Sequence, residues 1–412
     1  MTGQPTLRDS TRDIRKPSMN SHERIMAALY CQPVDRVPFI PHVGGYAIAS
    51  MPLRYQQMTR WELLAELGAD LFIRSRRGIA CWPPESFVPP STMLPLALLP
   101  ANMQSPPLKS LPDRSIEIRR TCRGHETLVT LDTPVGTIRS LWRQTPESPM
   151  IPFPVEPMLK TVEDLKVYQY ALERTIVEPW YDDLVATQTV LQGTGVVEAF
   201  GNCTPIQDLI MWHMGLENLV FMLQDHPDEI GAVLHMMQEV RKREYRVLAE
   251  SPADVVVTYE NTSTTLLSPS YMARYEFPAL AEYTEILHAA GKPHLIHMCG
   301  RIRGALELIG KAPFDGIMDV APSPTGDCDF RLAREKLCAA GKCLGGGIDA
   351  TAFAQATPEE METYVSNRLR EVAPGTGFLL GSGDAVPFGT SLENLRAAAR
   401  AAHRYGTYPI EA

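Results

Sequence analysis

Short apolar runs recur along the chain, and patterns typical of amphipathic helices separate most of them. Eight such runs can be counted, and their short lengths are those of buried strands. The runs are Arg36–Ile40, Asp70–Arg74, Val196–Phe200, Asp254–Tyr259, His294–Met298, Gly316–Val320, Cys343–Ile348 and Gly377–Gly381. The helical patterns between the last five runs include Pro269–Ala290, Arg301–Lys311, Phe330–Ala340 and Pro358–Val372. Alternating strands and helices favour a parallel sheet, and eight βα units predict a (β/α)8 TIM barrel. The alternative, an open doubly wound sheet, would carry a glycine-rich phosphate turn after its first strand, and no such turn is seen.

A long insertion separates the second run from the third. Its length of about 120 residues far exceeds the dozen or so that one crossover needs. Residues 81–113 are rich in proline and are expected to form an irregular loop. Glu126–Trp142 alternates apolar and polar residues around a Pro-Val-Gly turn, which predicts a β-hairpin. Two helices are expected to follow, at about 162–174 and 178–191. The insertion, at about 75–194, is therefore expected to cover one end of the barrel.

The N-terminal part is expected to begin as a polar tail over residues 1–19, since it has no apolar region of the kind found in secretory signals. Asn20 and Glu23 have capping-box spacing, so a helix through about Leu29 should precede the first strand. Residues 20–412 are then expected to form a single TIM-barrel domain that includes the insertion.

Composition restricts the partners of the chain. The 39 basic and 48 acidic side chains give a net charge of −9, which argues against nucleic-acid and anionic-membrane binding. No apolar run reaches the ~18 residues that a membrane span requires. The eight cysteines form no CxxC pair, which favours a reducing compartment. We therefore expect a cytoplasmic protein, which could form a homodimer.

Polar residues at the C-terminal ends of barrel strands are the first candidates for catalysis. His297 and Cys299 follow strand spacing, so they would point to the same face, and a nitrogen–sulfur pair of this kind suits zinc. The alternative is a buried histidine beside an inert cysteine. Glu260 ends the fourth run and Asp384 follows the eighth. Both are candidate metal ligands and, with His297, candidate catalytic residues.

Other residues near the expected mouth of the barrel allow two readings each. Glu276 is a candidate metal ligand, or a solvated carboxylate of the following helix. Asp319 could contact substrate, or could orient the histidine. Asn202 follows the third run and is a candidate substrate-binding residue. Tyr46 and Trp82 are candidates for an aromatic substrate pocket, as are Trp142, Trp180 and Trp212, although large aromatic side chains are more often part of the core.

Several segments of the chain resemble the uroporphyrinogen decarboxylase superfamily, and within it the zinc- and corrinoid-dependent methyltransferases. The segments are Asn20-Ser21-His22-Glu23-Arg24, Pro33-Val34-Asp35-Arg36-Val37-Pro38, Ile296-His297-Met298-Cys299-Gly300, Val386-Pro387-Phe388-Gly389-Thr390 and Leu392-Glu393-Asn394. The resemblance implies a TIM barrel in which His297 and Cys299 hold zinc. It also implies that a corrinoid (cobalamin) is carried by a partner protein, because the barrel and its insertion use the whole chain.

The branches of this superfamily differ in their site residues. The decarboxylases carry an Arg-Gln-Ala-Gly-Arg-Tyr stretch, and here the matching segment 41–46 has neither arginine. The methylcobamide:thiol methyltransferases hold zinc with a second cysteine after the last strand, where this chain has Asp384. The methyltransferases that begin aromatic O-demethylation use a pattern near Glu-x14-Glu-x20-His, and fifteen and twenty residues separate Glu260, Glu276 and His297.

The resemblance therefore favours transfer of a methyl group from an aryl methyl ether to the Co(I) corrinoid of a partner protein. Zinc with oxygen ligands would polarise the ether oxygen. The alternatives are a metal-independent decarboxylase, a methylcobamide:thiol methyltransferase, and a binding module that captures a methylated small molecule without turnover.

Overall fold

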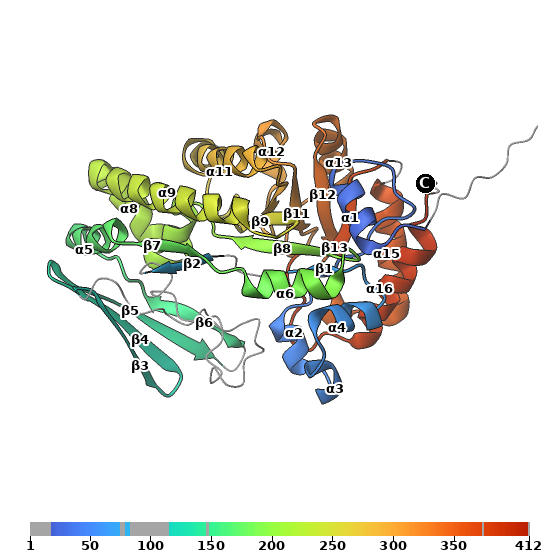
Figure 1. Ribbon diagram of the computed structural model, residues 1–412, viewed down its shortest axis with the longest axis horizontal. Helices are drawn as coiled ribbons and strands as arrows, with labels where there is room; N and C mark the ends of the chain where they lie inside the picture. Colours follow the sequence, from blue (N-terminus) through green and yellow to red (C-terminus); the bar gives the residue numbers. More distant parts are fainter. Residues whose placement is uncertain (1–17, 75–78, 83–114, 146–147, 373–374, 411–412) are drawn as a thin grey trace, which may run out of the picture.

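A curled parallel sheet of seven strands forms the centre of the molecule in the computed structural model (Figure 1). The structure describes all residues except 1–17, 75–78, 83–114, 146–147, 373–374 and 411–412. In spatial order the strands are β1 (Phe72–Ile73), β8 (Val196–Gly201), β9 (Val255–Tyr259), β10 (His294–His297), β11 (Gly316–Val320), β12 (Cys343–Ile348) and β13 (Phe378–Ser382). Helices cover the outer face of this sheet, so the strands are buried almost throughout, as is usual for parallel sheets with helical crossovers. The last seven predicted runs are thereby confirmed as strands.

The helices that connect these strands agree with the sequence patterns. The principal ones are α7 (Pro205–Asp208), α8 (Leu216–Asp225), α9 (Pro227–Glu250), α11 (Phe277–Ala289), α12 (Leu306–Lys311), α13 (Phe330–Ala339), α15 (Pro358–Val372) and α16 (Leu392–Tyr405). The predicted helix Pro269–Ala290 consists of α10 (Pro269–Tyr271), a π-helical turn η5 (Met272–Glu276) and α11. Ser268 caps it, as expected, by accepting a hydrogen bond from the Tyr271 amide. A second π-helical turn, η4 (Leu209–His213), follows α7.

The first predicted run, Arg36–Ile40, is not a strand, and this expectation was wrong. Pro38 and the following Pro41 lack the amide hydrogens that a continuous ladder needs. The segment nevertheless makes one parallel bridge, between Phe39 and Leu380 of β13. The Phe39 carbonyl also accepts a hydrogen bond from the Asp70 amide at 2.7 Å, just before β1. The segment therefore lies between the two edges of the curled sheet, which is consistent with the predicted TIM-barrel type.

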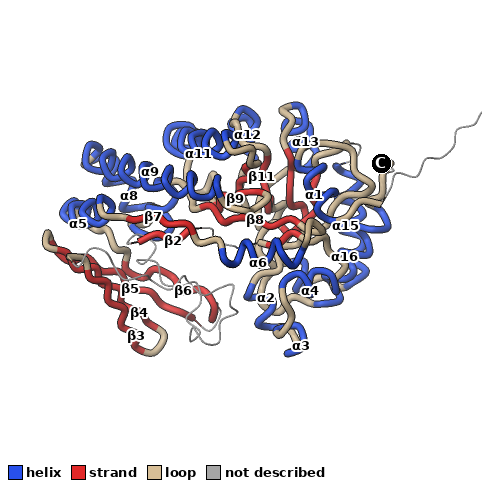
Figure 2. The backbone as a smooth tube through the Cα atoms, viewed as in Figure 1, coloured by secondary structure: helices blue, strands red, loops and turns tan. Residues whose placement is uncertain are grey.

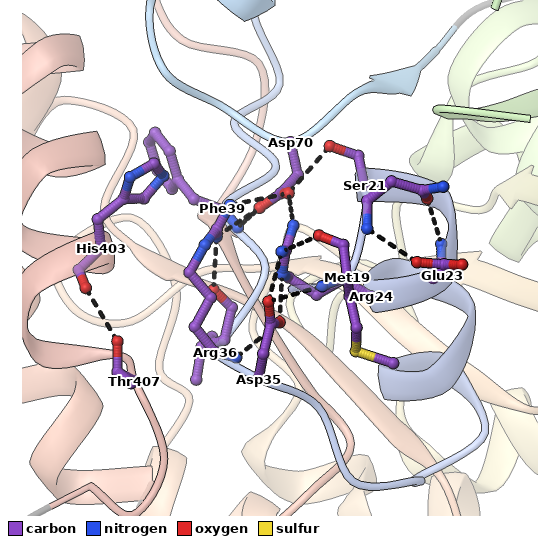
Figure 3. Close-up of polar contacts among 12 residues, drawn as sticks. Met19, Ser21, Glu23, Arg24, Asp35, Arg36, Phe39, Asp70, His403 and Thr407 are labelled. Atoms are coloured by element: carbon purple, nitrogen blue, oxygen red, sulfur yellow. Dashed lines mark hydrogen bonds and ion pairs between the residues drawn. The ribbon is translucent and has the colours of Figure 1, made fainter. Parts of the chain in front are cut away.

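Buried charges fix the segment Arg36–Ile40 near Asp70, at the N-terminal end of β1 (Figure 3). Asp70 is almost completely buried, and its carboxylate accepts hydrogen bonds from Arg24 at 2.6 Å and from Arg36 at 2.7 Å. The Phe39 amide donates to the same carboxylate at 2.9 Å. Arg24 also contacts Asp35, with 2.6 Å between Nε and Oδ1. The segment Arg36–Ile40 is called the closing segment below. One carboxylate thus joins α1 (Ser21–Leu29), the closing segment and the start of β1.

The helix predicted after the polar tail is confirmed as α1. Its capping box has both expected hydrogen bonds: Asn20 Oδ1 accepts from the Glu23 amide, and the Glu23 carboxylate accepts from the Asn20 amide. Three short helices, α2 (Gly45–Ser50), α3 (Leu53–Gln56) and α4 (Arg60–Glu66), lead from the closing segment to β1. The seven cysteines whose side chains the structure describes are all free thiols. Within the described ranges, no helix combines the length and the apolar character that crossing a bilayer would need.

The insertion forms a separate antiparallel sheet, which lies beside the barrel-like body (Figure 2). Its strands are β3 (Glu117–Arg123), β4 (Glu126–Thr133), β5 (Gly136–Thr145) and β6 (Ser148–Glu156). β4 and β5 are the predicted hairpin, and α5 (Val162–Glu173) and α6 (Asp182–Leu191) are the two predicted helices. The expectation of an irregular loop was wrong at its start, because Cys81 and Trp82 belong to β2 (Ile79–Trp82), which pairs with β7 (Ile176–Pro179). Residues 83–113 lie outside the described residues.

Candidate metal centre

Side chains from several strand ends meet at the C-terminal end of the sheet. His297 is the last residue of β10, and Asp319 lies in β11. Cys299 and Asp384 follow β10 and β13, and Arg74 follows β1. Parallel neighbouring strands bring their carboxyl ends to one side of the sheet, so residues far apart in the sequence become neighbours here.

Three of the predicted metal ligands come together. The imidazole of His297, the thiol of Cys299 and the carboxylate of Asp384 offer ligand atoms that all lie within 4.8 Å of one another. His297 Nε2 is 3.8 Å from Asp384 Oδ1. His297 is almost fully buried, whereas the Asp384 side chain is 51% exposed. The group is therefore buried on the side of His297 and accessible to solvent on the side of Asp384.

The His297 ring is held on two sides. Its Nδ1 lies 2.7 Å from Asp319 Oδ2, which is hydrogen-bonding distance. The Tyr259 ring stacks on it, with 5.0 Å between centroids and 24° between planes, and the Tyr259 hydroxyl donates to buried Glu198 at 2.6 Å. Burial lowers the pKa of His297, but Cys299 and Asp319 raise it more strongly, so that its pKa lies well above the usual value. Burial raises the pKa of the Cys299 thiol, and His297 offsets part of that rise.

Asp319 orients the histidine, which was one of its two predicted readings; contact with substrate is the other. Its backbone has a φ of +59°, a left-handed conformation that aspartate adopts more readily than most residues. Burial would raise the pKa of its carboxyl group, but Arg74 and His297 lower that pKa well below the usual value.

Arg74 is the residue of this network that the sequence interpretation missed. Its Nη1 donates to Asp319 Oδ2 at 2.5 Å. The signal was available, because Arg74 ends the second predicted run, at a strand end like the other candidates.

His42 approaches the same carboxylate, with 3.9 Å between its Nδ1 and Asp319 Oδ2. Burial and the nearby Arg74 lower the pKa of His42 well below its usual value, so this imidazole is neutral. His42, His297 and Asp319 make a second group of potential ligands. The guanidinium of Arg74 already lies on Asp319 Oδ2, which makes this second group a poor cation site.

Glu260 and Glu276 form a separate buried pair. Both are fully buried, and neither belongs to the groups of candidate ligands found among the described residues. Glu260 accepts hydrogen bonds from the amide and the hydroxyl of Thr204, and Glu276 accepts one from the Thr262 hydroxyl at 2.6 Å. Burial and the neighbouring Glu276 raise the pKa of Glu260 well above its usual value. Burial raises the pKa of Glu276 to about 7.

The three remaining predicted substrate-binding residues lie elsewhere or cannot be placed. The Asn202 amide donates to buried Glu244 at 3.0 Å, which ties the loop after β8 to α9. Tyr46 lies in α2 and Trp82 in β2, but their side chains lie outside what the structure describes.

A cleft of about 500 Å³ lies between β6 of the insertion and the segment η4–α8. Its lining includes Pro154, Met211, Trp212, Leu216 and Phe221. The Trp212 ring stacks on the buried Trp142 of β5, with 6.1 Å between centroids. The volume of the cleft is within the range of small-molecule sites.

Asn261 connects this cleft to the candidate metal centre. Its Nδ2 is 3.2 Å from the Met211 sulfur, and its Oδ1 is 3.5 Å from the Cys299 sulfur. Asn261 has a φ of +53°, a left-handed conformation that asparagine adopts more readily than most residues. The cleft wall is thus two side-chain contacts from Cys299.

Comparison with known proteins gives the family. The profile of the family described as uroporphyrinogen decarboxylase (URO-D) matches residues 140–405, well over half of the chain. The chain belongs to this family. The URO-D match covers β8 to β13 and ends with α16, so it includes every strand end from which the candidate ligands come. The superfamily resemblance seen in the sequence is therefore confirmed.

A solved structure of a methyltransferase from Methanosarcina mazei is similar to the URO-D chain, with a TM-score of 0.56 and 14% sequence identity. The similarity covers 94% of this chain and 99% of the other, and at this identity it supports the fold. No curated protein matches the sequence.

The site can be tested against the metal that the resemblance implies. His297, Cys299 and Asp384 offer nitrogen, sulfur and oxygen, and zinc accepts all three. Three protein ligands with an open fourth position are the arrangement of a catalytic zinc site, and the partly exposed Asp384 lies on the open side. These residues therefore fit zinc.

Proposed function

We propose that this URO-D family member is a methyltransferase that moves a methyl group from an aryl methyl ether to the Co(I) corrinoid of a partner protein. The observation that carries the proposal is the convergence of His297, Cys299 and Asp384 at the C-terminal end of the sheet. Family membership and the similarity of fold to a methyltransferase support it.

The proposed donor set explains the choice of substrate. Zinc held by His297, Cys299 and Asp384 would supply a Lewis acid for the ether oxygen, whose departure as a phenolate is otherwise difficult. A carboxylate in place of a second thiolate has the same charge but donates less electron density to zinc, so the ion would be more electrophilic than in the sulfur-rich sets of thiol methyltransferases. Asp384 therefore favours an ether over a thiol as the substrate.

The chain's own residues would position the ring of the substrate. The cleft beside Met211 and Trp212 is large enough for a small aromatic molecule. Asn261 lies between that cleft and Cys299, with an amide that can hydrogen-bond an oxygen substituent of the ring. The exposed side of Asp384 leaves the site open to a corrinoid protein.

Metal binding is the first test of this proposal. We expect about one zinc per chain by elemental analysis, and we expect His297→Ala to lose it because that change removes the buried ligand. His288→Ala is the matched control, since His288 lies on α11 with a side chain 42% exposed and should not affect zinc content. A folded wild-type protein that binds no zinc would contradict the proposal.

Turnover is the second test. The wild-type protein is incubated with an aryl methyl ether and a reduced corrinoid protein, and the cobalt spectrum should change to that of the methylated form. Methylation of the corrinoid from a methylated thiol alone would favour the thiol methyltransferase. Release of carbon dioxide from an aromatic acid without corrinoid would favour the decarboxylase.

The alternative donor set, in which Glu260 and Glu276 complete the site with His297, is tested by the same zinc analysis. Replacing Glu276 with Gln should leave the zinc content unchanged if the proposed set is correct. Replacing Cys299 with Ser should weaken zinc binding.

A further inference from the structure

Arg74 has an unusual position for a cation. It follows β1 directly, and its side chain is only 7% exposed. Its Nη1 donates to Asp319 Oδ2 at 2.5 Å, and its Nη2 donates to the Ile40 carbonyl at 3.3 Å. A buried charge costs free energy unless it is paired, so this guanidinium and the Asp319 carboxylate depend on each other.

The atom that Arg74 contacts is also the one that holds His297. Asp319 Oδ2 is 2.7 Å from His297 Nδ1. A carboxylate can only accept a hydrogen bond, so Nδ1 must carry the proton, and Nε2 is the nitrogen left for a ligand. Nε2 is the nitrogen that lies 3.8 Å from Asp384.

Asp319 needs an anchor of its own. Its side chain projects from a left-handed backbone, and Oδ1 has no hydrogen-bond partner among the residues that the structure describes. Within the described part of the chain, the hydrogen bonds of this carboxylate come from His297 and Arg74, and neutral His42 is farther away at 3.9 Å. Without Arg74 it would be a buried anion free to rotate, to take a proton, or to move toward a bound cation.

We infer that Arg74 is a positioning residue for the metal centre: it anchors Asp319, and Asp319 in turn fixes the His297 ring with Nε2 directed at Cys299 and Asp384. This inference rests on the metal site of the proposed function and extends it to a residue that follows a different strand, β1. In the described structure the hydrogen bonds of Arg74 go to Asp319 and to the Ile40 carbonyl, so its effect on the donor atoms would be transmitted through Asp319.

A purely structural role of Arg74 has to be separated from this one. Arg74 also holds the closing segment through the Ile40 carbonyl, so its loss could weaken the fold in general. Arg36 provides the matched control. It holds the same segment through Asp70 at the other end of the barrel (Figure 3), with 2.7 Å between Nη1 and Oδ2. Its side-chain hydrogen bonds in the described structure go to Asp70 and to the Val37 carbonyl, neither of which belongs to the proposed donor set.

The experiment compares Arg74→Met, Arg74→Lys and Arg36→Met in the full chain. The zinc dissociation constant is measured by competition with a chromophoric chelator, and the electronic spectrum of the Co2+-substituted protein reports the geometry of the cysteine ligand. We expect zinc to bind about 10–100-fold more weakly to Arg74→Met, with a changed Co2+ spectrum. Arg74→Lys should lose less, because one charged donor remains. Arg36→Met should lower the melting temperature without changing zinc affinity or spectrum.

Three results would overturn the inference. Wild-type affinity and spectrum in a folded Arg74→Met protein would show that Asp319 needs no anchor. An equal loss of zinc affinity in Arg36→Met would show that general weakening of the fold is the cause. If Arg74→Met does not fold, Arg74→Gln, which also lacks the charge, takes its place, and wild-type affinity and spectrum in that variant would have the same meaning. Failure of the wild-type protein to bind zinc would instead contradict the proposed function itself, and the inference with it.

Discussion

Glu260 and Glu276 show at the scale of single residues how burial changes a carboxylate. The two side chains are fully buried next to each other, and their hydrogen bonds come from the neutral donors of Thr204 and Thr262. Two negative charges in this environment would repel each other and lack solvent. The pair therefore keeps a proton at a pH where exposed glutamates have lost it.

This pair should make the stability of the protein fall as the pH rises. The pKa of Glu276 is raised from 4.5 to about 7 in the folded state, so between these values the folded state binds more protons than the unfolded state. Its stabilisation is complete below the unfolded pKa and is lost as the pH passes the folded pKa. We expect Glu276→Gln, which resembles the protonated side chain, to be more stable than the wild type at pH 8 by at most about 3 kcal/mol, and similar to it at pH 5.

Urea denaturation at several pH values between 5 and 8 measures this effect. Glu285→Gln is the control, because Glu285 is exposed on α11, the helix that follows Glu276 directly. The pH dependence of this variant should match the wild type. An unchanged slope of unfolding free energy against pH in Glu276→Gln would show that the pair does not hold the proton.

At the scale of elements, the antiparallel sheet of the insertion is attached to the rest of the molecule by apolar contacts. Trp142 of β5 is 1% exposed and stacks on Trp212 of η4. Its indole nitrogen donates to the Ser140 hydroxyl at 2.9 Å, so its polar atom is satisfied. The same η4 forms one wall of the cleft, and packing of the sheet therefore also shapes that wall.

Trp142→Ala should destabilise the protein by about 3–5 kcal/mol, because it leaves a large cavity in a packed core. Zinc content should be retained, since no residue of the insertion belongs to the proposed donor set. Denaturant unfolding and elemental analysis check the two parts. Phe153→Ala on β6, where the side chain is 48% exposed, should cost far less, and an equally small loss in Trp142→Ala would show that the stack does not anchor the sheet.

At the scale of the whole molecule, the closing segment Arg36–Ile40 depends on side chains more than on a ladder. It makes one parallel bridge to β13, and charged clusters hold it at both ends of the barrel. Asp70 with Arg24 and Arg36 fixes one end, and Arg74 fixes the other through Ile40. Weak backbone pairing is thus compensated by buried charges.

Asp70→Asn should therefore weaken the whole fold. The change removes one negative charge between two buried or half-buried arginines, and breaking a buried pair from one side costs about 3–5 kcal/mol. Thermal melting should show one cooperative transition at a lower temperature. Asp228→Asn, at an exposed position in the first turn of α9, should have a much smaller effect, and comparable losses in the two variants would contradict this role of Asp70.

Local sequence patterns were enough to predict seven strands of the central sheet, the helices between them, the hairpin of the insertion and the capped first helix. Each of these elements depends on the spacing of apolar residues and on capping residues within its own short stretch of sequence, so that stretch is enough to predict it. Local patterns did not show that Arg36–Ile40 fails to form a strand. The pairing of this segment depends on where its prolines lie relative to its backbone partners, Asp70 and Leu380.

Some residues of the candidate site could likewise be grouped from the sequence, and others only from the structure. His297 and Cys299 could be paired from their spacing alone, and Asp384 could be added from its place after the last strand. Only the tertiary structure separated Glu260 and Glu276 from that group, and only it joined Arg74 to His297 through Asp319. Charges act over distances in space, and the spatial neighbours of a buried side chain depend on how the whole sheet curls.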